Sequence, residues 1–212
     1  MYAYAFLAGD CPELRREDCP KNDDFILAAD GGYRHLMRLG LTPALLLGDF
    51  DSLDSAELAQ AEELGVQVIK WHEDKDFSDA DLAIQELSRR GYDQVRLCGA
   101  LGGDRFDHAL ANIGMMALWK RRGVEIELLH GNLLARVIEQ QSLKLLGTPG
   151  DIVSLLPLSS TVDGVFCEGM RFPLCNETLF AGQTRSLSNA LSTDEAIVKV
   201  AAGMLLVMHY RS

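Results

Sequence analysis

The chain has 212 residues, of which 48% are hydrophobic and 24% are charged, so it can bury a core and has the composition of an ordinary globular protein. Its formal net charge of −11 disfavours general binding to nucleic acid, because phosphate backbones are held by clustered Lys and Arg. The apolar residues 1–8 are too few to span a membrane and predict a first buried strand.

The cysteines are widely spaced and form no C-x-x-C pair; they are Cys11, Cys19, Cys98, Cys167 and Cys175. An odd number with this spacing disfavours both a disulfide framework and a zinc site. We therefore expect a protein of the reducing cytoplasm, with no membrane partner.

The first part of the chain predicts an alternation of strands and helices. Short aliphatic runs predict strands over residues 2–8, 25–29, 44–48, 66–70, 95–98 and 126–129. Helices are expected over residues 33–39, 55–64 and 79–90, each ending at a glycine suited to a left-handed C-cap. Asp54 and Glu57 have the spacing of a capping box at the start of the second helix. This alternation predicts an α/β domain over residues 1–130, with a doubly wound, mainly parallel sheet.

After Gly131 the pattern changes to short apolar runs separated by Gly, Pro, Asn and Ser, without a helical period of several turns. Strands are expected over residues 134–139, 143–146, 152–156, 162–167, 172–173, 196–200 and 205–210. This pattern predicts a C-terminal all-β, sandwich-like domain over residues 131–212.

The first candidate for chemistry is the tripeptide Asp30-Gly31-Gly32, between the second predicted strand and a helix. Paired glycines let backbone N–H groups approach a ligand closely, and the N-terminus of a helix favours phosphate. The same tripeptide is also an ordinary turn, and both interpretations stay open at this point.

Two carboxylates, Asp49 and Asp51, follow the apolar run 45–48. In an extended backbone residues i and i+2 point to the same side, so both would lie at the carboxyl end of a buried strand, where open α/β sheets bind ligands. The pair also resembles the aspartyl-phosphate motif of haloacid-dehalogenase-like phosphotransferases, which would make Asp49 a nucleophile. In that family the motif follows the first strand, whereas here it follows the third.

A second acidic segment, residues 74–79, precedes the third predicted helix. Ser78 or Asp76 could simply cap this helix, but the four carboxylates between residues 74 and 81 exceed what capping requires. Together with the earlier pair they could supply a hard oxygen site for Mg²⁺. Lys75, between these carboxylates, could contact a phosphate.

A glycine-rich segment follows the fifth predicted strand, over residues 99–108. Its glycines permit a tight loop around phosphate, and Arg105 could neutralise charge on transferred or departing phosphates. Asp107 and His108 fall near the start of the next helix, which continues through Asn112, and a lone His there is more often structural than catalytic. Neither a P-loop nor the usual dinucleotide fingerprint occurs in the chain.

These four segments, followed by Ser-Leu-Ser-Asn at residues 186–189, resemble the thiamine pyrophosphokinase family in order and spacing. The family pattern has Ala-Asp-Gly-Gly, Gly-Asp-Phe-Asp-Ser, Asp-Lys-Asp-x-Thr-Asp, Gly-Gly-Arg-x-Asp-His and Ser-x-Ser-Asn, so the resemblance spans almost the whole chain. Three positions depart from it: Ser78 replaces Thr, Asp104 is inserted before Arg105, and Ala190 stands where bacterial relatives often carry Glu.

The resemblance implies transfer of a diphosphate from ATP to the hydroxyl of thiamine, giving thiamine diphosphate and AMP. It implies that Mg²⁺ is held by Asp49, Asp51 and Asp79, and that these three act in catalysis with Arg105 and Asp107. Asp79 and Asp107 are candidates for a general base. The implied ATP-binding residues are Asp30, Gly31, Gly32, Lys75, Asp76, Arg105 and His108. The implied thiamine-binding residues are Ser186, Ser188 and Asn189.

The resemblance also implies a homodimer in which the β domain of one subunit completes the active site of the other. Three alternatives stay open from the sequence. The first is a diphosphotransferase for another alcohol, such as a hydroxymethyl pterin. The second is a non-catalytic, thiamine-binding sensor, and the third is a phosphohydrolase that uses Asp49 as its nucleophile.

Overall fold

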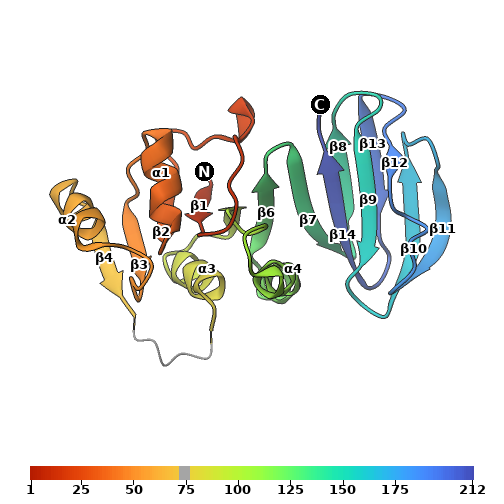
Figure 1. The fold of residues 1–212 in the computed structure, drawn as a ribbon. Helices are drawn as coiled ribbons and strands as arrows, with labels where there is room; N and C mark the ends of the chain where they lie inside the picture. Colours follow the sequence, from red (N-terminus) through yellow and green to blue (C-terminus); the bar gives the residue numbers. More distant parts are fainter. Residues whose placement is uncertain (72–76) are drawn as a thin grey trace. The chain divides into compact units, whose positions relative to one another are not determined.

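The computed structural model describes residues 1–71 and 77–212. These residues divide into two compact units (Figure 1). The first unit comprises Met1–Met115 and Arg122–Gly131, and the second comprises Met116–Arg121 and Asn132–Ser212. Two positions of the predicted ATP site, Lys75 and Asp76, lie outside the described residues.

The first unit contains a parallel sheet, whose strands are β1 (Ala3–Phe6), β2 (Phe25–Ala29), β3 (Leu45–Gly48), β4 (Gln67–Lys70), β5 (Gln94–Cys98) and β6 (Glu125–His130). Their order in the sheet is β6-β5-β1-β2-β3-β4. The chain thus adds strands outward on one side of β1 and then returns to add β5 and β6 on the other side. The strand order reverses between β1 and β5, and a doubly wound sheet forms its ligand crevice at such a point. The predicted doubly wound, mainly parallel sheet is confirmed.

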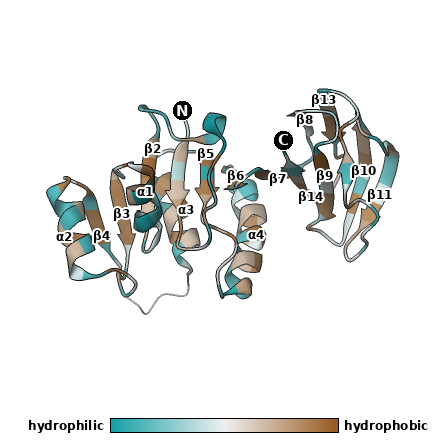
Figure 2. Cartoon of the chain, turned by 45° about the horizontal axis from the view of Figure 1, so that its top comes forward, coloured by the Kyte–Doolittle hydropathy of each residue, from teal (hydrophilic) through white to brown (hydrophobic). Residues whose placement is uncertain are grey.

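The central strands form because their sequences are continuously apolar. Leu45, Leu46 and Leu47 of β3 are fully buried, and so are Ala3 and Phe6 of β1. Parallel strands that are covered on both faces show such unbroken hydrophobic runs instead of alternation. Figure 2 shows β3 as predominantly hydrophobic. These buried strands support the loops at the carboxyl edge of the sheet.

Local signals define the ends of the helices, which are α1 (Gly32–Leu39), α2 (Ser55–Glu63), α3 (Asp79–Arg89) and α4 (Phe106–Arg121), with a 3₁₀ turn at Arg16–Asp18. The predicted capping box is confirmed, because Asp54 accepts a hydrogen bond from the Glu57 N–H at 2.8 Å and the Glu57 carboxylate accepts from the Asp54 N–H at 3.0 Å. Ser78 caps α3. Gly40 and Gly65 adopt φ values of 68° and 74° after α1 and α2, as their predicted C-cap role requires.

The second unit contains two antiparallel sheets. One has the strand order β12-β9-β14-β7, and its strands are β7 (Leu133–Glu139), β9 (Ile152–Pro157), β12 (Asn189–Ala190) and β14 (Met204–Tyr210). The other has the order β11-β10-β13-β8, and its strands are β8 (Ser142–Leu146), β10 (Thr161–Glu168), β11 (Leu174–Phe180) and β13 (Glu195–Lys199). Side chains from both sheets share one buried apolar cluster. The prediction of an all-β, sandwich-like domain is confirmed.

One predicted strand is wrong. Residues 172–173 lie in a bend before β11, which begins at Leu174. Pro173 has no N–H to donate to a strand ladder, and the Phe172 N–H donates to the Asn189 side chain instead. Among the described residues, no helix is long and apolar enough to cross a membrane.

Candidate active site

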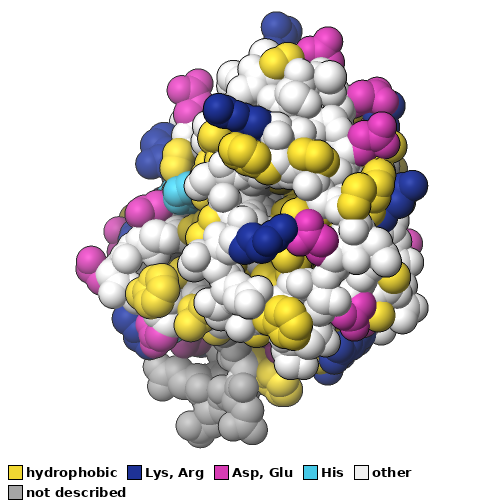
Figure 3. All heavy atoms as spheres, turned by 90° about the vertical axis from the view of Figure 1, so that its right-hand side faces the viewer, with side chains coloured by type: hydrophobic (Ala, Val, Ile, Leu, Met, Phe, Trp, Pro, Cys, Tyr) yellow, Lys and Arg dark blue, Asp and Glu magenta, His cyan; other side chains and the backbone are white. Residues whose placement is uncertain are grey.

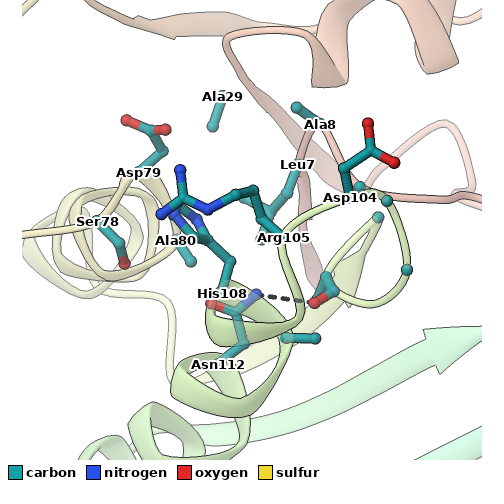
Figure 4. Close-up of a pocket in the computed structure, with 16 residues that line it drawn as sticks. Leu7, Ala8, Ala29, Ser78, Asp79, Ala80, Asp104, Arg105, His108 and Asn112 are labelled. Carbon is teal, nitrogen blue, oxygen red and sulfur yellow. Dashed lines mark hydrogen bonds between the residues drawn. The ribbon is translucent and has the colours of Figure 1, made fainter.

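The first unit contains a cavity of about 220 Å³ at the carboxyl ends of β1 and β5, where the strand order reverses. Its walls are formed by the segments that follow these two strands and by the first turns of α3 and α4 (Figure 4). The side chains of Asp79, Arg105, His108 and Asn112 line it. The cavity thus lies where the sheet topology leads us to expect a ligand.

Two glycine-bearing loops form the backbone wall of this cavity. The Gly9 N–H donates to the Gly99 carbonyl oxygen at 2.9 Å, and a Cβ on Gly9 would lie only 2.5 Å from that oxygen. Gly99, Gly102 and Gly103 have φ values of 67°, 74° and 75°, a region that favours glycine. The loops therefore pack backbone against backbone, and loops of this kind can present N–H groups to phosphate oxygens.

Asp30 supports the turn that carries the acidic pair. Its buried carboxylate accepts a hydrogen bond from the Phe50 N–H at 3.1 Å, and it fills the space that a Cβ on Gly48 would need. Asp30 and Phe50 both adopt positive φ values, 45° and 67°. The Asp51 N–H donates to the Asp49 carboxylate at 3.0 Å. The pair therefore lies in a tight turn and not in extended chain, so the side-to-side alternation assumed from the sequence does not apply to it.

Four carboxylates influence one another at this edge. Burial raises the pKa of Asp30 to about 7, and the negative charge of Asp79 is the next contribution, with smaller ones from Asp49 and Asp51. Burial likewise raises the pKa of Asp79, and the charges of Asp49 and Asp51 add to this. Such mutual repulsion is relieved by a cation, and carboxylate oxygens are the ligands that Mg²⁺ prefers. Within the described part of the chain, no three acidic, His or Cys side chains form a ready-made metal cluster.

Arg105 and Asp107 form a bidentate ion pair at the mouth of the cavity. Their contacts are 3.0 Å from Nε to Oδ1 and 2.7 Å from the terminal nitrogen to Oδ2, and both side chains are more than 60% exposed. The Arg105 guanidinium lowers the pKa of Asp107 to about 2. Figure 4 shows the Arg105 guanidinium and the Asp79 carboxylate on the same side of the pocket. An exposed arginine of this kind can exchange its carboxylate partner for a phosphate.

Of the remaining predicted ATP-site residues, His108 lines the cavity, whereas Gly31 and Gly32 do not. His108 lies in the first turns of α4. Gly31 and Gly32 begin α1, and a Cβ on Gly32 would collide with the Phe6 carbonyl oxygen, so this glycine permits close packing of helix on strand. Ala29, which precedes the tripeptide, lies on the cavity wall.

Asn112 is a cavity residue to which the sequence interpretation gave no role. It lies on α4, four residues after His108, and helical spacing i, i+4 places both on one face. The i, i+4 spacing is visible in the sequence. It could identify Asn112 as a cavity residue only once the His108 face of α4 was known to border the cavity.

The second unit has a cavity of about 190 Å³ lined by Phe172, Leu174, Arg185, Ser186 and Asn189. Ser186 is buried, and its hydroxyl donates to the Leu155 carbonyl oxygen at 2.6 Å. The Asn189 side chain accepts from the Phe172 N–H at 3.0 Å and donates to the Phe172 carbonyl oxygen at 2.7 Å. Two of the three predicted thiamine-binding side chains thus line a pocket while they hold its backbone in place.

The third predicted thiamine-binding residue, Ser188, is held by its backbone. Its N–H donates to the Ser154 hydroxyl at 3.0 Å, and its φ is 56°. Ser186 and Ser188 lie in the segment between β11 and β12, and Asn189 is the first residue of β12.

The cavity at the strand-order reversal, its phosphate-compatible loops and the acidic edge define an α/β protein with a phosphate-binding type of site and an additional β domain. Comparison with protein families agrees: "Thiamin pyrophosphokinase, catalytic domain" matches residues 17–128, and "Thiamin pyrophosphokinase, vitamin B1 binding domain" matches residues 139–205. The chain belongs to the thiamine pyrophosphokinase family. The resemblance seen in the sequence motifs is confirmed, and the pterin-specific and sensor alternatives are not favoured.

Individual relatives support the same family. Thiamine pyrophosphokinase from Bacillus subtilis is 27% identical over 192 residues, which cover 86% of this chain and 85% of the relative. A crystal structure of thiamine pyrophosphokinase from Bacillus subtilis has a TM-score of 0.85 at 21% identity, with complete coverage of both chains. Thiamin pyrophosphokinase from Candida albicans has a TM-score of 0.81 at 16% identity and covers 99% of this chain and 90% of its own. The two structural matches show that the fold is shared.

Proposed function

We propose that this protein transfers the terminal diphosphate of ATP to the primary hydroxyl of thiamine, giving thiamine diphosphate and AMP. The observation that carries the proposal is the cavity between the ends of β1 and β5, which joins glycine loops, Arg105 and Asp79 in one place. In the reaction the thiamine oxygen forms a bond to the β-phosphorus, and the bond from this phosphorus to the α,β-bridging oxygen breaks. AMP departs with that oxygen, and the hydroxyl proton passes to a base.

We propose Asp49, Asp51 and Asp79 as the residues that hold Mg²⁺. The support is the chemistry of the donor set, which consists of carboxylate oxygens at one sheet edge. Burial and neighbouring negative charge raise the pKa of the proposed ligand Asp79 and of Asp30, which lies beside the set. Bound Mg²⁺ would neutralise charge on the polyphosphate. Asp30 supports the turn that presents two of these ligands.

The polyphosphate contacts are assigned to Arg105 and the glycine loops, with His108 beside them. Lys75 and Asp76 remain part of this proposal on the strength of the motif. When Arg105 binds phosphate it gives up Asp107, whose carboxylate then becomes free to accept the hydroxyl proton. Asp79 is the other candidate for this base. Positioning and charge neutralisation supply most of the catalysis in such transfers.

We assign residues 1–130 to nucleotide and metal binding and catalysis, and residues 131–212 to thiamine binding and dimerisation. Ser186, Ser188 and Asn189 are proposed at the thiamine site, and a cationic substrate suits a chain of net charge −11. The homodimer with a shared site follows from the family resemblance. Exposed Phe172 and Leu187 in the second unit support it, because exposed apolar side chains can be covered by a partner. Figure 3 shows hydrophobic side chains exposed on one face of the molecule. Five free cysteines support a reducing cytoplasm.

The test uses ATP labelled at the β-phosphate, thiamine and Mg²⁺. Labelled thiamine diphosphate and AMP should form in equal amounts. Absence of labelled thiamine diphosphate would overturn the proposal. Release of orthophosphate would instead support the phosphohydrolase, and label in a hydroxymethyl pterin supplied as a competing acceptor would support the other diphosphotransferase.

A further inference from the structure

Asn112 connects helix α4 to the loop that follows β5. Its side-chain amide donates a hydrogen bond to the Ala100 carbonyl oxygen at 2.8 Å (Figure 4). Asn112 is only 6% exposed and Ala100 is 4% exposed, so the bond lies away from solvent although both residues border the cavity. A buried hydrogen bond of this kind leaves an unsatisfied carbonyl when its donor is removed.

The loop that receives this bond is rich in glycine. Gly99, Gly102 and Gly103 all have positive φ values, and glycine has more backbone freedom than any other residue. On its other side the loop is attached through backbone bonds, from the Gly9 N–H to Gly99 at 2.9 Å and from the Asp10 N–H to Leu101 at 2.8 Å. Asn112 thus supplies a side-chain attachment of the loop to α4.

This attachment affects the position of Arg105 relative to the glycine loop. Arg105 immediately follows the loop and precedes α4, and its carbonyl oxygen accepts from the His108 N–H at 3.1 Å. A shift of Ala100 relative to α4 therefore moves the loop N–H groups and Arg105 relative to one another. Misplacement of a substrate-positioning group by about 1 Å can lower a rate about 100-fold.

We propose that Asn112 is a positioning residue for diphosphate transfer: its amide holds the Ala100 carbonyl so that the glycine loop and Arg105 meet the ATP polyphosphate together. This role rests on the proposed function, because it presumes that the cavity takes ATP. It assigns no direct contact between Asn112 and the phosphates.

The experiment compares Asn112→Ala and Asn112→Asp with the wild type. The first removes the donor, and the second replaces it with an oxygen of similar shape that cannot donate when ionised. We expect kcat/KM for ATP to fall about 10- to 100-fold in both variants, with KM for thiamine unchanged. Binding of Mg²⁺·ATP, measured by calorimetry, should weaken in parallel.

Tyr4→Phe is the matched control. Tyr4 donates from its hydroxyl to the Asp18 carbonyl oxygen at 2.9 Å, also buried and in the same unit, but it does not border the cavity. This variant should lower the melting temperature and leave kcat/KM for ATP unchanged.

Three results would count against the positioning role. If the Asn112 variants lose thermal stability as Tyr4→Phe does but keep wild-type kcat/KM for ATP, the bond only stabilises the fold. If neither variant folds, Asn112 belongs to the core and the proposal is wrong. If KM for thiamine rises as much as KM for ATP, the effect is not specific to the polyphosphate. A wild-type protein that binds Mg²⁺·ATP without making thiamine diphosphate would refute the proposed function alone, because the calorimetric comparison still tests Asn112.

Discussion

The carboxylate of Asp30 and the backbone N–H of Phe50 are joined by a hydrogen bond of 3.1 Å, although twenty residues separate them in the chain. This contact links the end of β2 to the turn after β3. It makes Asp30 the support of the turn that presents Asp49 and Asp51.

Asp30→Ala should lower Mg²⁺-dependent turnover more than Asp30→Asn does. The amide of the Asn variant keeps an oxygen that can accept from the Phe50 N–H, whereas the Ala variant leaves that donor without its partner. Steady-state rates at saturating ATP and thiamine would measure the difference. Equal losses in both variants would show that the charge of Asp30 matters and not its hydrogen bond.

Asp51→Asn should lower turnover on the order of 100-fold or more while the protein stays folded, because it removes a charged ligand of the proposed metal site. Asp54→Asn is the matched control, three residues away. Asp54 caps α2, and Asn caps helices about as well as Asp, so this variant should keep its activity. Circular dichroism and turnover across a Mg²⁺ titration would separate the two. Near-full activity of Asp51→Asn would refute the metal assignment.

The protein without Mg²⁺ should become more stable as the pH falls through about 7, with Asp30 as the contributing group. Its pKa in the folded state is raised from 3.8 to about 7, so the folded state binds this proton more tightly than the unfolded state does. The contribution of Asp30 to the stability of the folded state is therefore gained as the pH falls from above 7 towards 3.8.

Thermal unfolding of wild type and Asp30→Asn across this pH range would test the assignment. The variant cannot ionise at this position, so its stability should lack this part of the pH dependence. Its stability should exceed that of the wild type most at high pH. Parallel curves for the two proteins would contradict the prediction.

Arg105→Gln should raise KM for ATP more than Arg105→Lys, because lysine keeps the positive charge but not the two-pronged geometry. In the Gln variant the pKa of Asp107 should also rise from about 2 towards its ordinary range, since the guanidinium that lowers it is gone. Carboxyl-carbon NMR titration would measure that pKa. An unchanged titration of Asp107 would show that the ion pair is absent in solution.

Asn189→Ala should raise KM for thiamine and leave KM for ATP unchanged. The substitution removes both side-chain bonds to the Phe172 backbone, which forms one wall of the second cavity. Asn189→Asp keeps the acceptor for the Phe172 N–H and should show a smaller effect. The pattern is the reverse of that expected for Asn112, so the two variants control for each other. A rise in KM for ATP would argue against a thiamine-specific role.

Much of the architecture was predictable because its signals are local. The capping box at Asp54 and Glu57, and the left-handed glycines Gly40 and Gly65, mark helix ends through contacts of a few residues. Continuous apolar runs predicted buried parallel strands, since such strands are covered on both faces. The strand Leu174–Phe180 was not predicted, because its sequence is neither a continuous apolar run nor a regular apolar–polar alternation. Its burial is correspondingly irregular, and it begins directly after a proline.

By itself the sequence determined the family and most of the strands and helices, because these follow from motifs and from periodicity read along the chain. The tertiary structure decided which side chains touch. Asp30 reaches Phe50, Asn112 reaches Ala100 and Ser186 reaches Leu155 only because particular strands and helices pack side by side. Such contacts depend on strand order and packing, and no local rule along the chain specifies them.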